Sequence, residues 1–236
     1  MPKFAICTPT RSAPSTPYID SLAASVQVAK EHGWDVVSGT PEYSPLTLEV
    51  GSPYISHARS KALHKALHAG AEAVIFIDDD LSWQPDALWR LLDVGDPVVC
   101  GTYRFKKEPE EYMGGVLSKD DGTPMAVAGF VEMATVPAGF LKITRDGVNH
   151  VMQQWPELIY GEPCSPHVDL FNHGAHGGQW WGEDFAFARR WRERCGKIWL
   201  IPDLQIDHWA GETKYAGNFE NYLRRQPGGD LAKDGE

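Results

Sequence analysis

The sequence has few cysteines, no long apolar run and no excess of basic residues. Its cysteines lie far apart and form no Cys-x-x-Cys pair, which favours a reducing compartment; they are Cys7, Cys100, Cys164 and Cys195. No stretch approaches the roughly 20 apolar residues that cross a bilayer, and the N-terminus lacks the apolar region of a secretory leader. We therefore expect a cytoplasmic protein without a membrane span.

The charge balance is acidic, and the composition is that of a globular protein. Asp and Glu number 32 against 22 Lys and Arg, so the net charge of -10 disfavours a broad electrostatic grip on nucleic acid or on an anionic membrane. With 42% hydrophobic residues, the chain can bury a sizeable core and is not disordered as a whole. Its 236 residues fit one large domain, because no internal repeat or linker interrupts them.

The first hundred residues alternate between apolar strands and amphipathic helices. The strands are expected at 4–7, 34–37, 73–77 and 97–103, and the helices at 18–32, 55–69 and 85–92. The strand at 73–77 is continuously apolar, which is typical of a strand buried on both faces of a sheet. This alternation predicts an α/β fold whose central sheet contains parallel strands.

The alternation weakens beyond residue 105. Further strands are expected at 127–130, 133–136, 139–143, 197–201 and 204–208, and a further helix at 183–195. The segment 160–182 is rich in Gly, His and Pro and has no sustained period, which indicates a mobile functional loop containing His167, His173 and His176. Residues 226–236 are expected to form a flexible tail.

Three consecutive carboxylates follow the apolar strand at 73–77. Asp78, Asp79 and Asp80 would repel one another strongly unless solvent or a cation offsets their charge. The carboxyl ends of parallel strands face the ligand crevice, and alternation along the strand would point Asp78 and Asp80 the same way. Hard oxygen ligands suit Mg²⁺ or Mn²⁺, whose other positions can be filled by diphosphate oxygens and water. The alternative is a solvated acidic turn.

A second acidic pair, Glu183 and Asp184, opens the helix expected at 183–195. One of these carboxylates, kept ionised by the helix dipole, could accept the proton of an attacking hydroxyl. Adjacent helical residues project about 100° apart, so only one of the two is expected to face a substrate. The alternative is that both merely stabilise the helix through its macrodipole, by about 0.3–1 kcal/mol.

One histidine and two tryptophans complete the candidate residues. His208 ends the strand expected at 204–208, where its imidazole could join the aspartates as a metal ligand and favour Mn²⁺ over Mg²⁺. A histidine merely packed beside Trp209 is the alternative. Trp180 and Trp181 could stack against a sugar or a base, or could anchor the preceding loop to the core.

Four motifs therefore follow one another along the chain: a strand ending in Thr8-Pro9-Thr10, a strand ending in Asp78-Asp79-Asp80, the Glu183-Asp184 pair and His208. Their order and spacing, over about residues 3 to 210, resemble the GT-A glycosyltransferases, particularly the family-2-like group. The resemblance implies a Rossmann-like α/β domain at 1–225, with a mixed central sheet flanked by helices. A nucleotide-binding half would span about 1–105, and an acceptor and catalytic half about 106–225.

The resemblance also implies an activity, which is metal-dependent transfer of a hexosyl or pentosyl group from a nucleoside-diphosphate sugar, with a UDP-sugar as the expected donor, to an acceptor hydroxyl. Asp78 and Asp80 would be the outer carboxylates of a DxD-type motif and, with His208, would hold Mn²⁺ or Mg²⁺. Asp184 would be the base of an inverting enzyme, with Glu183 beside it. The residues implied to contact the nucleotide-sugar are Thr8, Pro9, Thr10, Arg11, Glu42, Arg59, Asp78 and Asp79. Ser60 follows Arg59 where the family commonly has asparagine.

The acceptor is open at this level. Basic residues gather at Arg104, Lys106 and Lys107 and along 189–194, so hydroxymethylated bases in DNA are an option beside a glycan or a small molecule. Ordinary exposed helix charge is the alternative. Two other functions compete with sugar transfer: a nucleotidyltransferase, although no Gly-rich phosphate loop with a lysine follows the first strand, and a non-catalytic module that binds a nucleotide-sugar.

Overall fold

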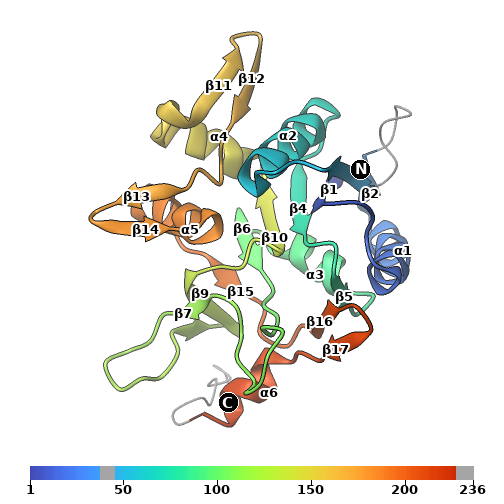
Figure 1. Ribbon diagram of the computed structural model, residues 1–236, viewed down its shortest axis with the longest axis vertical. Helices are drawn as coiled ribbons and strands as arrows, with labels where there is room; N and C mark the ends of the chain where they lie inside the picture. The colour runs from blue at the N-terminus through green and yellow to red at the C-terminus, as the bar shows by residue number, and fades with distance from the viewer. Residues whose placement is uncertain (38–45, 227–236) are drawn as a thin grey trace.

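A mixed sheet lies at the centre of the molecule (Figure 1). The computed structural model describes residues 1–37 and 46–226, and within them the sheet has ten strands. These are β1 (Lys3–Thr10), β2 (Asp35–Val36), β3 (Leu46–Val50), β4 (Ala73–Ile77), β6 (Val98–Cys100), β7 (Gly115–Val116), β8 (Ala126–Val127), β9 (Phe130–Thr135), β10 (Phe140–Thr144) and β15 (Trp199–Leu200). The main path runs β2-β1-β4-β10-β6-β15-β9-β7, with β3 beside β1 and β8 beside β9.

The sheet changes strand direction beside its central strand. β1 pairs in parallel with β2, β3 and β4, as the alternating pattern predicts. β10 then inserts antiparallel between β4 and β6. The expected α/β architecture with a mixed central sheet is confirmed: its parallel pairs are those of β1 with β2, β3 and β4 and that of β6 with β15.

Helices cover both faces of the sheet. They are α1 (Thr16–Glu31), α2 (Ile55–His68), α3 (Ala87–Asp93), α4 (Arg145–Gln154) and α5 (Glu183–Arg194), with α6 (Phe219–Arg224) near the end of the described chain. Alternate residues of β4 divide between the two layers: Ile75 packs in the cluster of α1 and α3, and Phe76 in that of α2, α4 and α5. This two-sided burial explains the continuous apolar run. Among the described residues, no helix combines the length and the apolar character needed to cross a bilayer.

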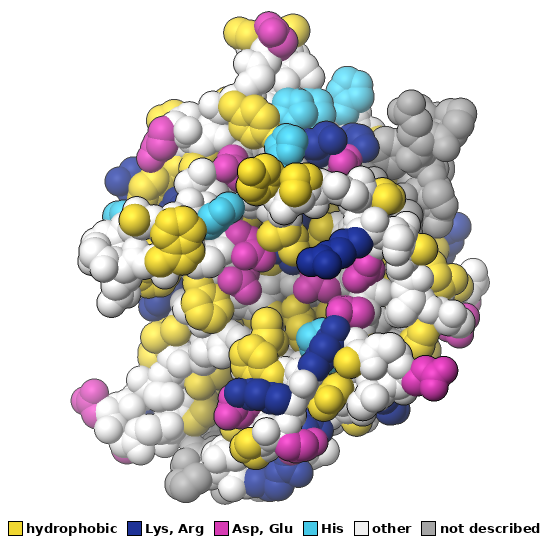
Figure 2. Space-filling view, in the orientation of Figure 1, with side chains coloured by type: hydrophobic (Ala, Val, Ile, Leu, Met, Phe, Trp, Pro, Cys, Tyr) yellow, Lys and Arg dark blue, Asp and Glu magenta, His cyan; other side chains and the backbone are white. Residues whose placement is uncertain are grey.

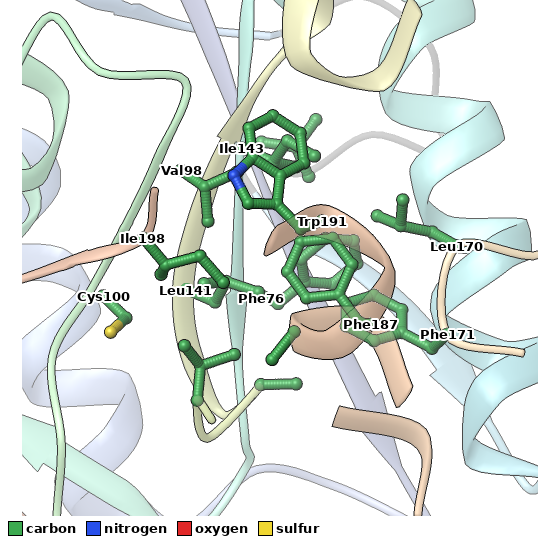
Figure 3. Close-up of a cluster of buried hydrophobic side chains, with 14 of the residues drawn as sticks. Phe76, Val98, Cys100, Leu141, Ile143, Leu170, Phe171, Phe187, Trp191 and Ile198 are labelled. Atoms are coloured by element: carbon green, nitrogen blue, oxygen red, sulfur yellow. The ribbon is translucent and has the colours of Figure 1, made fainter. Parts of the chain in front are cut away.

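Aromatic packing fixes α5 against the sheet (Figure 3). Phe76 of β4 meets Phe171 edge-on, with ring centroids 5.0 Å apart, and Phe171 meets Phe187 of α5 at 5.3 Å. Trp191 lies one turn further along α5 and is also buried. Buried aromatic side chains contribute strongly to packing energy, so this cluster fixes where the acidic first turn of α5 lies relative to the end of β4.

A second, three-stranded sheet begins where the acidic cluster ends. β5 (Leu81–Trp83) follows Asp80 directly and pairs antiparallel with β16 (Ile206–Ala210), which pairs with β17 (Thr213–Tyr215). The register places His208 opposite Leu81. A short strand that the sequence pattern did not reveal therefore brings His208 beside the acidic turn.

Several sequence predictions are wrong in detail. The segment 160–182 is largely two hairpins, β11 (Ile159–Glu162) with β12 (Ser165–Val168) and β13 (Gly174–His176) with β14 (Gln179–Trp181). Their strands are short and mostly exposed, so they carry no alternating pattern that could reveal them. The strand expected at 127–130 spans a turn, because Ala128 and Gly129 have φ angles of 50° and 83°. Helix α4 was not expected, although Thr144 caps it by accepting from the Gly147 N–H.

Candidate functional site

An open cleft of about 520 Å³ lies at the carboxyl ends of β1 and β4. It is lined by Thr10 and Arg11 after β1, by Asp78, Asp79 and Asp80 after β4, and by Tyr103 and His208, among others. Figure 2 shows acidic and basic side chains facing one another around a hollow in the middle of this face. In open α/β sheets this edge is where ligands bind, and the volume is that of a small-molecule site.

The first aspartate of the cluster is held in a partly buried network. Arg59 of α2, which is 2% exposed, donates from Nη2 to Asp78 Oδ1 at 2.8 Å and from Nη1 to Glu183 Oε1 at 2.6 Å. The Tyr103 hydroxyl donates to Asp78 Oδ2 at 3.1 Å. Gly139 makes room for this network, because a Cβ there would collide with the Tyr103 hydroxyl and the Asp78 carboxylate. Both oxygens of Asp78 are thus engaged by protein groups.

Arg59 is the link between the acidic turn and helix α5. Its guanidinium also lies over the ring of Phe171, 5.3 Å from the centroid. The sequence associates Arg59 with the nucleotide, but the side chain does not line the cleft and is committed to two carboxylates. Burying the guanidinium costs desolvation energy, and removing it would leave the charges of Asp78 and Glu183, whose side chains are 28% and 24% exposed, without their partner.

Asp79 lies in the turn between β4 and β5, and its backbone carbonyl accepts from the Ser15 N–H at 2.9 Å. Burial raises the pKa of its carboxyl group, the charges of Asp80 and Asp78 add to that rise, and a hydrogen bond with Thr10 opposes it. The three aspartates lie beyond the end of β4, with Asp79 and Asp80 in a turn, so strand alternation does not set their directions, although Asp78 and Asp80 both line the cleft.

Asp80 lines the cleft, and two basic side chains contact its carboxylate. His208 Nε2 lies 3.4 Å from Asp80 Oδ1, and Lys106 forms an ion pair with Oδ2. Burial alone would raise the pKa of Asp80, but His208 and Lys106 outweigh it and lower the pKa. The carboxylate therefore stays ionised and is 34% exposed.

His208 is oriented as a metal ligand would be. Its Nδ1–H donates to the Arg104 carbonyl at 2.7 Å, which orients the ring so that Nε2 faces Asp80 Oδ1. One carboxylate and one imidazole suit Mn²⁺ or a similar cation. Within residues 1–37 and 46–226, however, no three His, Cys, Asp or Glu side chains form a group that could hold a metal ion. Asp78 lines the same cleft as Asp80 and His208, but both of its carboxylate oxygens are bound by Arg59 and Tyr103.

The acidic pair at the start of α5 divides between two environments. Glu183 is bound to Arg59, whereas Asp184 accepts only a local hydrogen bond, from the Phe185 N–H at 2.8 Å, within the described residues. Burial, reinforced by the neighbouring Glu183 charge, raises the pKa of Asp184 to about 6. Asp184 directly follows Glu183, whose partner Arg59 also binds the cleft residue Asp78, so Asp184 lies near the cleft without lining it.

The remaining expected nucleotide contacts are only partly in the cleft. Pro9, Thr10 and Arg11 line it, but Thr8 is buried, with its hydroxyl 2.6 Å from that of Tyr18. Glu42 lies outside the described residues. Sequence reasoning missed Glu49 of β3, a buried cleft residue that is paired with Lys61 at 3.1 Å and Lys65 at 2.5 Å.

Glu49 was missed because the strand that carries it, β3, was not expected from the sequence. The residue is opposite Pro9 in the parallel pairing of β3 with β1. Burial would raise the pKa of Glu49, but hydrogen bonds from Lys65 and Lys61 outweigh it and lower the pKa. An ionisable residue flanked by apolar ones after a Pro-rich segment is the signal that could have drawn attention to it.

The two tryptophans differ in how they are held and in how far they are exposed. Trp181 is held by Nε1–H donation to the His176 carbonyl at 3.1 Å and by the Arg189 guanidinium over its ring. Trp180 is 73% exposed, and the ring of His173 lies edge-on to it, with centroids 6.2 Å apart. An exposed tryptophan on a hairpin directly before α5 is thus available to a ligand.

The basic residues suggested for a polyanionic acceptor are mostly paired within the protein. Lys107 pairs with Glu111 and Arg104 with Glu108, and both pairs lie on the loop that follows β6. On α5, Arg189 pairs with Glu193, and Arg190 is buried, donating to the Asn172 carbonyl. The described residues thus do not support a continuous positive face for DNA.

No protein-family model and no curated protein sequence matches the chain. Solved structures do resemble it. The crystal structure of A197 from STIV matches with a TM-score of 0.51 at 16% identity, covering 90% of this chain and 87% of that one. The structure of GalNAc-T7 with UDP, GalNAc and Mn²⁺ matches with a TM-score of 0.53 at 12% identity, covering 95% of this chain. The chain spans about half of GalNAc-T7, 47% of its length. The fold of this chain is therefore the GT-A type, a mixed central sheet flanked by helices as in the glycosyltransferase GalNAc-T7.

Proposed function

We propose that this protein transfers a sugar from a nucleoside-diphosphate sugar to an acceptor hydroxyl. One observation carries the proposal: an open carboxylate–imidazole pair, Asp80 with His208, lines a cleft beside a separate carboxylate, Asp184, whose pKa is raised to about 6. The first pair suits a cation that binds diphosphate, and the second group suits a base. The GT-A fold supports this assignment, because the similar structure of GalNAc-T7 contains UDP, GalNAc and Mn²⁺.

The nucleoside would lie over the ends of β1 and β3. Pro9, Thr10 and Arg11 line that part of the cleft, and Arg11 is exposed, so its guanidinium can meet phosphate oxygens. Asp79 would face the ribose, and the buried carboxylate of Glu49 borders the same pocket. A UDP-sugar is the donor we propose.

Asp80 and His208 would hold Mn²⁺ or Mg²⁺, with substrate oxygens and water completing the ligand set, since the described protein groups alone do not complete it. When bound, the cation would offset the negative charge that develops on the departing diphosphate. Asp78 would support the site indirectly. Its carboxylate fixes the turn through Arg59 and Tyr103, and so positions Asp80.

Asp184 would accept the proton of the acceptor hydroxyl as that oxygen attacks the sugar. A carboxyl with a pKa near 6 is largely ionised at pH 7, and is more basic than an ordinary aspartate. Glu183 is unsuited to this role because it is bound to Arg59. A single displacement by the hydroxyl inverts the anomeric centre, so we propose an inverting hexosyl- or pentosyltransferase.

The acceptor would be a glycan or a small molecule that carries a sugar ring. Trp180 presents its indole to solvent on the hairpin that leads into Asp184, and an indole face can stack on the apolar face of a sugar. Replacing Trp180 with Ala should raise the acceptor KM about tenfold and leave kcat and stability nearly unchanged. An unchanged KM for every accepted sugar acceptor would exclude the platform.

The function is tested by identifying the released product. Purified protein is supplied with a panel of nucleoside-diphosphate sugars, Mn²⁺ and hydroxyl acceptors, and the released nucleotide is separated by chromatography. Release of nucleoside diphosphate together with a glycosylated acceptor is expected. Asp184→Asn should lower transfer about 100- to 10,000-fold while retaining donor binding. Pyrophosphate release would instead indicate a nucleotidyltransferase, and binding without turnover a binding module.

A further inference from the structure

Lys106 binds the Asp80 carboxylate at the position that a metal ion carrying the diphosphate would need. Its ammonium group pairs with Asp80 Oδ2, on the carboxylate whose other oxygen faces His208. The lysine comes from an exposed loop after β6, yet its side chain is only 32% exposed because it reaches inward to the acidic turn. The protein thus carries its own cation where the proposed function places a metal ion.

The neighbouring basic residues of the loop behave differently. Lys107 pairs with Glu111 at 2.6 Å, and Arg104 pairs with Glu108 at 2.8 Å, so both are neutralised by carboxylates of their own loop. Lys106 instead reaches a carboxylate 26 positions earlier in the chain. Of the three cations, Lys106 is the one aimed at the cleft, and Lys107 is a matched reference for it.

The Lys106 ammonium group and a divalent metal ion would compete for the Asp80 carboxylate. The ammonium group uses Asp80 Oδ2, and the positive charges would repel one another strongly across the few ångströms of a partly buried site. A metal ion arriving alone must therefore displace Lys106 into solvent. A metal ion arriving with a diphosphate would offer Lys106 a new anionic partner, because it would bring phosphate oxygens to the same carboxylate.

We propose that Lys106 exchanges partners during donor binding: it neutralises Asp80 when the cleft is empty and contacts the diphosphate when the donor and cation are bound. This inference rests on the proposed function and adds an order in which the cation and the donor bind. Lys106 weakens binding of the metal ion alone and strengthens binding of the nucleoside diphosphate with the metal ion. The cleft is thereby selective for the complete metal–diphosphate unit.

The experiment measures two affinities in wild type, Lys106→Gln and Lys107→Gln. Mn²⁺ binding alone is followed by the electron paramagnetic resonance signal of free Mn²⁺, and UDP binding at saturating Mn²⁺ by calorimetry. Lys106→Gln should bind Mn²⁺ alone several-fold tighter and UDP roughly tenfold weaker, since a charge-assisted contact is lost. Lys107→Gln should match wild type in both. Asp80→Asn should abolish Mn²⁺ binding with either residue at position 106.

The opposite changes expected in Mn²⁺ affinity and UDP affinity separate this role of Lys106 from a structural one. Damage to the loop would weaken both affinities together, and that result would overturn the proposal, as would equal behaviour of Lys106→Gln and Lys107→Gln or absence of Mn²⁺ binding in all variants. Its failure is distinguishable from failure of the proposed function. Sugar transfer by wild type without these shifts rejects Lys106 alone, whereas opposite shifts without transfer to any acceptor reject the transferase activity alone.

Discussion

The two ends of the acidic turn are built for different tasks, although Asp78 and Asp80 are the same residue type two positions apart. Asp78 is bound by the buried Arg59 and by Tyr103. Asp80 is bound by Lys106, from an exposed loop, and faces His208 on the open side of the cleft. One end is locked into the fold and the other can exchange its partners.

A cluster of like charges can be both stable and reactive when its members have different partners. Pairing Asp78 with a buried guanidinium offsets part of the mutual repulsion and holds that end of the turn in place. Asp80 is then presented at a defined position, with its charge offset by groups that can move away. The same division recurs in α5, where Glu183 is locked to Arg59 and Asp184 is free of ion pairs within the described residues.

Breaking the locked end should have the largest effect. Replacing Arg59 with Met leaves Asp78 and Glu183 without their shared cation. Removing one partner of a buried ion pair costs about 3–5 kcal/mol of unfolding free energy, and we expect the lower end of this range because the side chains of Asp78 and Glu183 are 28% and 24% exposed. Urea denaturation at pH 7.5 measures the change. Arg59→Lys should recover only part of the loss, because an ammonium group cannot form the two-armed contact of a guanidinium.

Asp80→Asn is the control at the open end. It removes only exchangeable, partly exposed contacts, so the unfolding free energy should change by no more than about 0.5–1 kcal/mol. If Arg59→Met and Asp80→Asn changed stability equally, the distinction between a locked and an open carboxylate would be wrong.

Much of this contrast could not be read from the sequence. The apolar run before Asp78 predicts a strand end correctly, because burial on both faces of β4 leaves a clear signal. The fold class and the helical start at Glu183 follow from similarly strong patterns. Which aspartate is locked depends on Arg59, on a helix 19 positions earlier, and on Tyr103, 25 positions later. Such contacts are set by tertiary packing and leave no local period.

Short strands were the other source of error. β5 has three residues and β13 three, too few to show alternation, and both belong to small sheets outside the main one. β5 nevertheless decides the site, because its pairing with β16 sets His208 beside Asp80. The histidine was found as a candidate residue, but the sequence could not supply the pairing that places it.

The Glu183–Asp184 pair offers a smaller and sharper test, because the two neighbours should respond with opposite signs. Burial and the Glu183 charge raise the pKa of Asp184 from 3.8 to about 6, so the folded state holds the proton more tightly than the unfolded state. The resulting stability is present below about pH 3.8 and is lost as the pH rises through 6. Ionised Asp184 therefore destabilises the fold at neutral pH.

Asp184→Asn should raise the unfolding free energy at pH 7.5 by about 1–2 kcal/mol, after allowance for partial exposure to solvent, and the gain should shrink as the pH falls below 6. Glu183→Gln should instead lower stability, because it removes a hydrogen-bonded charge from Arg59. Urea denaturation between pH 4.5 and about 7.5 follows both variants. A stabilised Glu183→Gln or a destabilised Asp184→Asn at neutral pH would contradict the assignment of the free carboxylate. The gain in unfolding free energy expected for Asp184→Asn accompanies the expected loss of transfer. Both have the same cause, because the ionised Asp184 carboxylate that destabilises the fold is also the proposed base.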